Sequence, residues 1–213
     1  MNWLITGGCG FLGTALIKRL LKEKSSHNIR VIDNLSVGSR DDLVQVCDFD
    51  EKSPEILDDD FKGVELVVGD ILDESIALLA TKGIDVIVHF AANTGVGPSV
   101  EEPRFDCLTN VIGTFNYLDA ARLNNVPRFV FASSGAPAGE VEPPIHEELP
   151  PHPVSPYGAS KLAGEGYCSA YYKTFGVDTV ALRFGNVYGP GSIHKSSVVA
   201  KFIKKAFNRE TLE

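Results

Sequence analysis

Short apolar runs alternate with longer stretches of helical periodicity along this chain. The apolar runs cover residues 2–6, 29–32, 64–68, 85–90, 128–132 and 178–182, and they are rich in Val, Ile, Leu and Phe. The helical stretches cover residues 11–24, 73–81, 103–123, 155–175 and 196–207. Continuous apolar strands are buried on both faces, and strands separated by helices form parallel βαβ units. The pattern predicts an α/β fold with a doubly wound, mostly parallel sheet.

Size and charge narrow the class of protein. The chain has 213 residues, 44% of them hydrophobic, which suits one domain with a buried core over residues 1–213. Its net charge of −8 disfavours nucleic-acid binding, because Lys and Arg must neutralise phosphates there. Residues 48–60 hold seven carboxylates and one lysine, so we expect a solvated surface excursion in this stretch.

Cysteine usage and hydropathy bear on the location of the protein. The four cysteines, at positions 9, 47, 107 and 168, form no Cys-x-x-Cys pair and have no histidine at metal-ligand spacing. We expect free buried thiols in a reducing cytosol and no metal site. No apolar run approaches the roughly 18 residues of a membrane span, and the apolar start lacks the basic leader of a signal peptide. The sequence predicts a soluble cytoplasmic protein with no membrane partner.

A glycine-rich turn joins the first predicted strand to the first predicted helix. It reads Gly7-Gly8-Cys9-Gly10-Phe11-Leu12-Gly13. In such a turn the first glycine permits tight bending, the second admits a pyrophosphate, and the third lets helix and strand approach. The helix N-terminus then presents free N–H groups to the phosphates. The glycines alone also fit a plain tight turn, but their place between strand and helix indicates a dinucleotide-binding Rossmann fold.

An acidic residue at the end of the second predicted strand supports the dinucleotide site. Asp33 comes twenty residues after Gly13, the spacing of the carboxylate that binds a ribose 2′-hydroxyl. That carboxylate would repel a 2′-phosphate, so we expect NAD over NADP, and Arg40 is the residue that could reverse the preference. Asp70 and Ile71 follow the third predicted strand and would lie beside the adenine, although Asp70 also fits a helix N-cap.

A tyrosine and a lysine begin the second long predicted helix. Tyr157 and Lys161 are four residues apart and therefore share one helix face. A free tyrosine, with a pKa of about 10, is a poor base at neutral pH. We expect the Lys161 ammonium and an oxidised nicotinamide to lower the pKa of Tyr157. The phenol could then take the proton of a substrate hydroxyl.

Three further polar residues follow or flank the predicted strands. Ser134 comes just after the fifth predicted strand and would point toward the same substrate oxygen, or would form a turn. Asn110 stands among apolar neighbours in the first long helix and is either a supporting residue or a surface position. Asn186 follows the sixth predicted strand and could donate to a substrate phosphate or lie in a turn.

Together these residues resemble the extended short-chain dehydrogenase/reductase family, in its NAD-dependent sugar epimerase/dehydratase branch. The resemblance covers essentially the whole chain and rests on motifs whose combination is highly specific. These motifs are Thr6-Gly7-Gly8-Cys9-Gly10-Phe11-Leu12-Gly13, Asp33-Asn34-Leu35-Ser36-Val37-Gly38, His89-Phe90-Ala91-Ala92, Asn110-Val111-Ile112-Gly113-Thr114, Ser155-Pro156-Tyr157-Gly158-Ala159-Ser160-Lys161 and Arg183-Phe184-Gly185-Asn186-Val187-Tyr188-Gly189-Pro190.

The resemblance implies a tightly bound NAD and assigns roles to individual residues. Catalysis falls to Ser134, Tyr157 and Lys161, with Asn110 in support, and substrate binding to Ser134, Tyr157 and Asn186. It also implies a homodimer in which the two long helices form a four-helix contact. The cofactor residues are then Gly7, Gly10, Phe11, Leu12, Gly13, Asp33, Asn34, Ser36, Gly38, Asp70, Ile71, Ala91, Ala92, Asn110, Tyr157 and Lys161.

The residues after Ser134 favour one reaction within this family. Dehydratases usually carry Asp-Glu there and decarboxylases a Glu, whereas this chain has Gly135-Ala136. We therefore expect a nucleotide-sugar epimerase, with a UDP-sugar as substrate, that works through a transient 4-keto sugar. The alternatives are a dehydratase or reductase on the same scaffold, and a non-catalytic NAD-binding sensor.

Two departures from the family pattern matter. The family commonly has Val-Tyr-Gly where this chain has Pro137-Ala138-Gly139, so the sugar pocket would differ. Family members are also longer than this chain. We therefore expect that most of the C-terminal substrate-binding region is absent from residues 1–213.

Overall fold

The computed structural model describes residues 1–23, 27–192 and 198–211. Within them, seven strands form one sheet in the order β3-β4-β2-β1-β5-β6-β7, and every neighbouring pair is parallel. This is the doubly wound α/β sheet that the sequence predicts. The strands are β1 (Asn2–Thr6), β2 (Asn28–Asp33), β3 (Asp50–Lys52), β4 (Val64–Val68), β5 (Val86–His89), β6 (Arg128–Ser134) and β7 (Asp178–Phe184).

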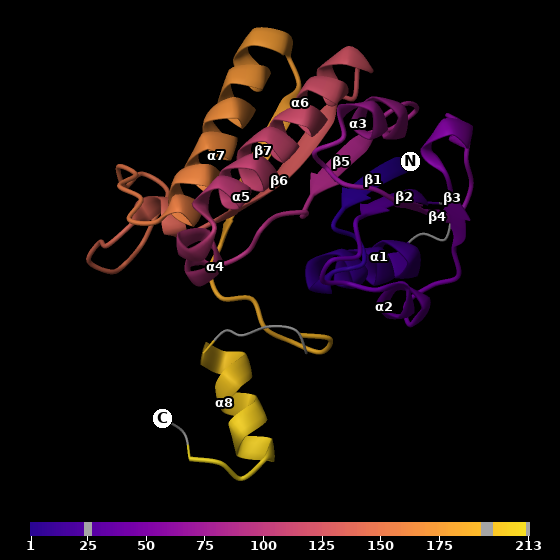
Figure 1. The fold of residues 1–213 in the computed structure, drawn as a ribbon. Helices are drawn as coiled ribbons and strands as arrows, with labels where there is room; N and C mark the ends of the chain where they lie inside the picture. Colours follow the sequence, from indigo (N-terminus) through magenta and orange to yellow (C-terminus); the bar gives the residue numbers. More distant parts are fainter. Residues whose placement is uncertain (24–26, 193–197, 212–213) are drawn as a thin grey trace.

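Helices cover both faces of the sheet, as Figure 1 shows. One side carries α1 (Phe11–Glu23) and α2 (Arg40–Val44), and the other carries α3 (Glu74–Ala80), α5 (Pro103–Cys107), α6 (Gly113–Leu123) and α7 (Pro156–Phe175). The shorter α4 (Val96–Glu101) precedes α5, and α8 (Val198–Phe207) lies apart from the sheet. Two 3₁₀ turns, η1 (Pro54–Ile56) and η3 (Ala136–Ala138), and a π-helical turn, η2 (Leu108–Ile112), complete the described elements.

The core is divided by the sheet into two apolar clusters. The larger cluster packs Phe129 and Phe131 of β6 against Leu118 of α6 and Tyr171 of α7. The smaller cluster joins the other face of β1, β2 and β4 to α1 and α2 through residues such as Ile17. Because both faces are covered, these strands read as continuous apolar runs, which is why they were recognisable in the sequence.

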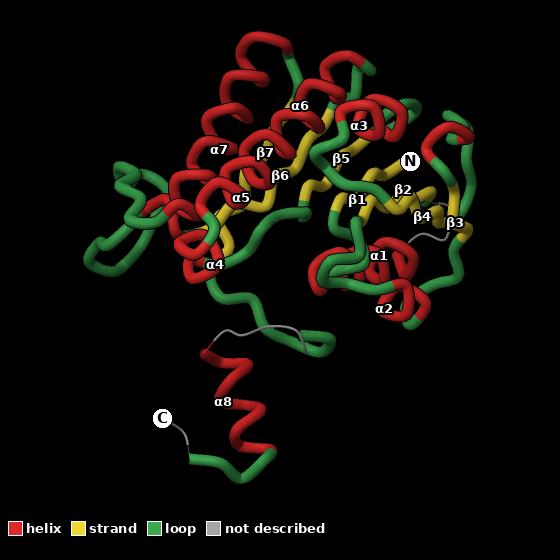
Figure 2. The backbone as a smooth tube through the Cα atoms, in the orientation of Figure 1, coloured by secondary structure: helices red, strands yellow, loops and turns green. Residues whose placement is uncertain are grey.

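The structure adds elements that the hydrophobic pattern did not predict. They are α2, α4 and the edge strand β3, which pairs with β4 from within the acidic stretch 48–60. The acidic side chains of that stretch are exposed as expected, so β3 presents no apolar signal. The predicted helix 103–123 is interrupted by the π turn, and Figure 2 shows α5 and α6 as successive helical segments. Residues 24, 196 and 197 of two predicted helices lie outside the described residues.

The structure bears on two expectations, the burial of the cysteine thiols and the absence of a membrane-spanning helix. Cys9 and Cys168 are buried and free, Cys47 is half-buried, and Cys107 is exposed. The expectation of buried thiols is therefore wrong for Cys107, which lies on the short helix α5. Among the described residues no helix combines the length and apolar character needed to cross a membrane.

Candidate active site

The turn between β1 and α1 leaves no space for larger side chains. Gly7 has φ = 68°, a conformation that favours glycine, and its N–H donates to the Ile32 oxygen at 2.7 Å. A Cβ on Gly13 would lie 2.4 Å from the Gly8 Cα, so a side chain there would push α1 away from the turn. The start of α1 therefore stays close to the sheet edge, where its free N–H groups suit a phosphate.

A cleft of about 910 Å³ opens where β1, β2, β4 and β5 end. This volume lies within the roughly 300–1,000 Å³ of typical ligand sites. Gly13, Asn110, Tyr157 and Lys161 are outside its lining, although the sequence assigned them to the cofactor as well. The predicted cofactor residues that line it are Gly7, Gly10, Phe11, Leu12, Asp33, Asn34, Ser36, Gly38, Asp70, Ile71, Ala91 and Ala92.

The Asp33 carboxylate is fixed at the edge of this cleft by two backbone donors. Its Oδ2 accepts from the Cys9 N–H at 2.9 Å, and its Oδ1 accepts from the Leu35 N–H at 2.9 Å. Burial raises the pKa of Asp33, and these two hydrogen bonds lower it. The bond to Cys9 ties the carboxylate to the glycine-rich turn. One rigid unit thus combines the phosphate-binding backbone with the predicted ribose-binding acid.

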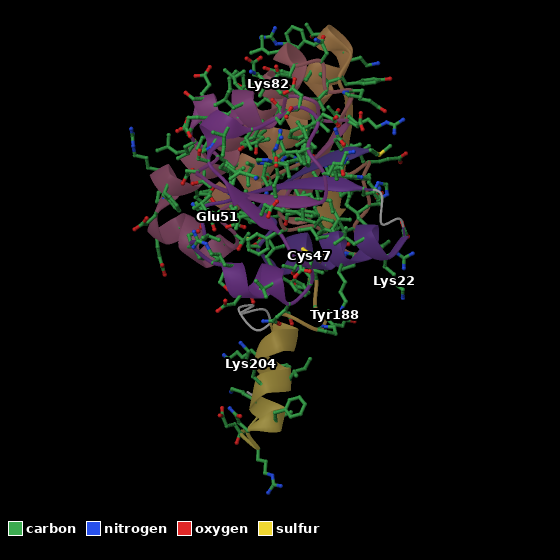
Figure 3. All side chains as sticks on the ribbon, turned by 90° about the vertical axis from the view of Figure 1, so that its right-hand side faces the viewer. Lys22, Cys47, Glu51, Lys82, Tyr188 and Lys204 are labelled. Carbon is green, nitrogen blue, oxygen red and sulfur yellow. The ribbon has the colours of Figure 1, made fainter. Side chains whose placement is uncertain are left out.

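Arg40, which could have favoured NADP, is bound elsewhere. Its Nε and Nη2 donate to the Glu51 carboxylate at 2.7 and 2.8 Å, across from α2 to β3. Arg40 does not line the cleft, whereas Asp33 does. Glu51, labelled in Figure 3, lies on β3. The bidentate pairing engages the guanidinium with Glu51, so Arg40 has a carboxylate partner of its own outside the cleft lining.

Asn34 and Asp70 also line the cleft, where they bond each other. The Asn34 Nδ2 donates to the Asp70 Oδ2 at 3.0 Å, and the Leu72 N–H donates to the Asp70 Oδ1 at 2.9 Å. The N-cap of α3 is Asp73, whose carboxylate accepts from the N–H groups of Ser75 and Ile76. Asp70 is therefore not the helix cap and remains at the cleft, as the dinucleotide interpretation expects.

The first turn of α7 carries Tyr157. Ser155 caps the helix by accepting from the Gly158 N–H at 3.1 Å, and Pro156 occupies the first helical position. Ser134, at the end of β6, accepts from the Ala136 N–H at 3.2 Å. The structure brings Ser134 and Tyr157 together, since hydrogen bonding by Ser134 lowers the pKa of Tyr157.

Lys161 lies one helical turn further and is almost fully buried, with 3% of its surface exposed. Its Nζ donates to the Ala132 oxygen at 2.9 Å and lies 4.9 Å from the Phe131 ring centroid and 5.8 Å from that of Tyr157. Burial lowers the pKa of Lys161 to about 8, although Asp106 raises it. Tyr157 and Lys161 thus share one face of α7, as their spacing predicts.

From the sequence we expect the Lys161 ammonium to help lower the pKa of Tyr157. With the groups that this chain itself supplies, the pKa of Tyr157 is raised, so that expectation is wrong for them. Burial raises the pKa of Tyr157, hydrogen bonding by Ser134 lowers it, and Asp106 raises it. The physical reason is that the phenol is desolvated while the Lys161 ammonium is directed at the Ala132 oxygen. A lowered pKa therefore requires positive charge in addition to that of Lys161, as the oxidised nicotinamide would provide.

Asn110 is buried, not a surface position. It lies in the π turn, and its Nδ2 donates to the Asp106 Oδ1 at 2.9 Å, the Asn93 oxygen at 2.9 Å and the Ser160 Oγ at 3.2 Å. Its Oδ1 accepts from the Asn93 N–H at 2.8 Å. Asn110 therefore joins the cleft wall at Asn93 to the first turns of α7 at Ser160. The supporting role in catalysis that the resemblance implies stays a prediction.

His89 is a buried residue to which the sequence analysis gave no role. Its Nε2 lies 3.3 Å from the Thr114 Oγ1, and its Nδ1 lies 2.9 Å from the Thr6 Oγ1. The Thr114 hydroxyl donates to the main-chain oxygen of Asn110 at 2.7 Å. The Thr114 Oγ1 is therefore left to accept the proton on the His89 Nε2. Nδ1 then accepts from Thr6. Burial lowers the pKa of His89 to about 3, so the ring is neutral.

Glu165 was also missed, although it lies one helical turn after Lys161. Its carboxylate accepts from the Ser133 Oγ at 2.6 Å and from the Arg183 Nε and Nη2 at 2.9 and 2.7 Å. These bonds hold α7 against the ends of β6 and β7, beside Ser134. A carboxylate spaced four residues from Lys161 on the same helix face was the available signal.

Another predicted site residue lies away from the cleft. Asn186 is exposed, two residues beyond the end of β7, and does not line the cleft, whereas Pro190 and Gly191 further along do. Figure 3 shows Tyr188 on the segment that leads from the sheet toward α8. Ala138, where the resembling family has tyrosine, is buried in η3, which packs on α7.

The residues present fit a pyridine dinucleotide. Glycines keep the α1 N-terminus open to a phosphate, since a Cβ at Gly13 would meet backbone atoms. Asp33 is held beside the glycine turn by Cys9 and Leu35, and Ala91, with its small side chain, lines the cleft. A phosphate-binding helix start, a fixed acid and small wall residues are the parts that such a cofactor requires.

Comparison with known proteins agrees with this geometry. The profile of the NAD dependent epimerase/dehydratase family matches residues 3–213. The chain belongs to this family. It is 37% identical over 193 residues to a UDP-glucose 4-epimerase of Mycolicibacterium smegmatis, which covers 89% of this chain and 57% of that protein. It is also 32% identical to a dTDP-glucose 4,6-dehydratase of the same organism, which covers 89% of this chain and 54% of that protein.

Solved structures of epimerase/dehydratase family members superimpose on the whole chain. A UDP-glucose 4-epimerase of Thermus thermophilus in complex with NAD has a TM-score of 0.82 at 35% identity, covering 99% of this chain and 64% of that one. A dTDP-glucose 4,6-dehydratase of Streptomyces venezuelae, also with NAD bound, has a TM-score of 0.84 at 32% identity, covering 100% of this chain and 64% of that one. The family is NAD-dependent and modifies nucleotide sugars, and this chain spans less than two thirds of these relatives.

Proposed function

We propose that this chain carries the NAD-binding and acid–base residues of a UDP-sugar 4-epimerase. The observation that carries this proposal is the composition of the site around Tyr157. Its phenol hydrogen-bonds with Ser134, and the next two residues, Gly135 and Ala136, have no ionisable group. Epimerisation needs one group to take and return a proton on a single oxygen, whereas elimination of water needs an added acid and base.

Each residue of the acid–base site has a separate chemical role in this proposal. Tyr157 takes the proton of the sugar 4-hydroxyl and later returns it, while Ser134 donates a hydrogen bond to the same oxygen. Lys161 places positive charge behind Tyr157, and an oxidised nicotinamide would add the further positive charge that the phenolate form requires. Bound NAD supplies reversible hydride acceptance at the same carbon. Asn186 would contact the diphosphate of the nucleotide sugar.

A dehydratase is the second candidate, and the similarity to dehydratases favours it. The Streptomyces venezuelae dehydratase superimposes as well as the Thermus thermophilus epimerase does. Its product would be a 4-keto-6-deoxy sugar. We rank it below the epimerase because Gly135 and Ala136 offer no proton donor or acceptor beside Ser134.

An NMR assay of the full-length protein on UDP-glucose and UDP-galactose tests the proposal. We expect interconversion of the two sugars without net NADH formation. Tyr157→Phe should lower the rate by a factor of about 10² or more, since it removes the acid–base group. Tyr172→Phe, an exposed tyrosine on the same helix, is the matched control and should leave the rate unchanged. A 4-keto-6-deoxy product, or stoichiometric NADH, contradicts the epimerase.

We also propose a cytoplasmic homodimer built on the outer faces of α5, α6 and α7. Supporting this, exposed apolar side chains line the π turn η2 and helix α7, including Leu108, Ile112, Tyr167, Tyr172 and Phe175. Such a row on a folded surface is typical of a protein interface. Ile112→Glu should convert the dimer to a monomer in analytical ultracentrifugation, whereas Val180→Glu, on the exposed strand β7, should not.

A further inference from the structure

Asp106 is a fully buried carboxylate beside the proposed acid–base site. It lies on α5 with 0% of its surface exposed. Its Oδ1 accepts from the Asn110 Nδ2 at 2.9 Å and from the Asn93 Nδ2 at 3.5 Å. Its Oδ2 has no hydrogen-bond partner among the described residues. Burying a carboxylate with one unpaired oxygen is costly, so this arrangement requires a compensating interaction.

A chain of hydrogen bonds leads from Asp106 to the backbone of Tyr157. The Asn110 Nδ2 donates to the Asp106 Oδ1 and to the Ser160 Oγ, the latter at 3.2 Å. The Ser160 hydroxyl in turn donates to the main-chain oxygen of Tyr157 at 3.0 Å. Because the Asn110 Oδ1 accepts from the Asn93 N–H, the amide cannot turn over without losing bonds on both sides. Asp106 thus fixes the amide that connects the π turn to the first turn of α7.

The Lys161 ammonium is the positive charge on which Asp106 acts. The titratable groups that interact with its ammonium are Asp106 from α5, His89 from β5 and Tyr157 from its own helix α7. His89 is neutral because burial lowers its pKa, and burial keeps the Tyr157 phenol protonated by raising its pKa. From β6 the ammonium meets the neutral Ala132 oxygen and the Phe131 ring. Asp106 is therefore the negative partner among these groups, and it raises the pKa of Lys161.

We propose that Asp106 is a positioning residue of the acid–base site, whose Oδ1 fixes the Asn110 amide and whose buried negative charge keeps Lys161 an ammonium. This inference rests on the proposed roles of Tyr157 and Lys161. It assigns Asp106 two separable contributions, a hydrogen-bond acceptor and a charge. Asp106→Asn separates them, because the amide oxygen can still accept from Asn110 while the charge is lost.

The test is an NMR titration of Lys161 in the full-length protein labelled with ¹³Cε-lysine, with the resonance assigned by Lys161→Met. In Asp106→Asn we expect the pKa of Lys161 to fall by about one pH unit or more, as for loss of a nearby opposite charge. Asp119→Asn is the control: Asp119 on α6 bonds Arg122 and Tyr171 and does not act on Lys161. An unchanged titration of Lys161 in a folded Asp106→Asn protein overturns the proposal.

A second variant, Asp106→Ser, covers the case in which Asp106→Asn fails to fold. It also removes the charge while leaving a hydrogen-bond acceptor, so Lys161 should again titrate at lower pH than in the wild type. An identical titration in both proteins overturns the proposal. These readings need no substrate, so they distinguish failure of this inference from failure of the epimerase assignment. In an active enzyme, the pH profile of kcat for Asp106→Asn should also shift to lower pH, because Asp106 raises the pKa of Tyr157.

Discussion

Lys161 donates its ammonium to the main-chain oxygen of Ala132, at 2.9 Å, one residue before the serine pair that ends β6. This bond connects α7 to the strand that carries Ser134. The lysine therefore serves both as a structural link and as the source of positive charge near Tyr157. The same burial that makes the link rigid lowers the pKa of the amine, so its charge is held at a cost in free energy.

Lys161→Met should change the pH dependence of stability. The pKa of Lys161 is about 8 in the folded state, against 10.5 for the unperturbed side chain. Between these values the unfolded state binds more protons, so the lysine destabilises the fold at neutral pH and this penalty fades as the pH rises. Urea unfolding from pH 7 to 10.5 should show wild type gaining roughly 3 kcal/mol relative to Lys161→Met. The same pH dependence of the unfolding free energy in both proteins would contradict this prediction.

His89 should remain neutral well below pH 6. Burial lowers its pKa to about 3, from 6.5 for an exposed ring. The unfolded state takes up a proton as the pH falls through 6.5 while the folded state does not, so stability is lost progressively toward pH 3. ¹⁵N NMR should show the Nε2–H tautomer at every pH at which the protein is folded, with the resonance identified by its loss in His89→Gln. An Nδ1–H tautomer would contradict the hydrogen-bond chain.

Asp33→Asn should weaken both NAD binding and the discrimination against NADP. The variant loses the charge that repels a 2′-phosphate, and its amide can offer only one oxygen to the two N–H donors of Cys9 and Leu35. We expect the dissociation constant for NAD to rise by a factor of about 10, as for loss of a charge-assisted hydrogen bond, and that for NADP to change less. Titration calorimetry with both cofactors measures this, and Asp41→Asn on the exposed side of α2 is the control.

The buried ion pair of Arg30 and Glu65 should be costly to break on one side only. Both residues are nearly inaccessible, and the guanidinium also donates to the oxygens of Ala80 and Asp58. Arg30→Met leaves the Glu65 charge unpaired, which should lower the free energy of unfolding by about 3–5 kcal/mol.

Two comparisons check the origin of that effect. Adding Glu65→Leu to Arg30→Met removes the unpaired charge and should recover most of the loss, which urea unfolding measures. Arg19→Met, in the exposed pair with Glu23, should cost at most about 1 kcal/mol. Equal losses for Arg19→Met and Arg30→Met would contradict the role of burial.

The central strands and the long helices were predictable because the polarity of their residues follows the burial of each position. Strands β1, β2, β4, β5 and β6 are largely buried, so each is mostly apolar, and the buried Arg30 of β2 and Glu65 of β4 are paired with each other. Edge strand β3 reads Asp-Glu-Lys and owes its conformation to pairing with β4. No local pattern marks such a strand, and the same holds for the π turn around Asn110, which a 3.6-residue period does not reveal.

The sequence by itself determined the dinucleotide fold, the glycine turn, the placement of Asp33 and the shared helix face of Tyr157 and Lys161, because these follow from strand order and helical spacing. Only the tertiary structure decided which partner each charge has. Arg40 turns to Glu51, and Lys161 is held by Ala132 with Asp106 nearby. Those partners lie far apart in sequence, and their effect depends on burial, since desolvation sets the strength of every charge interaction.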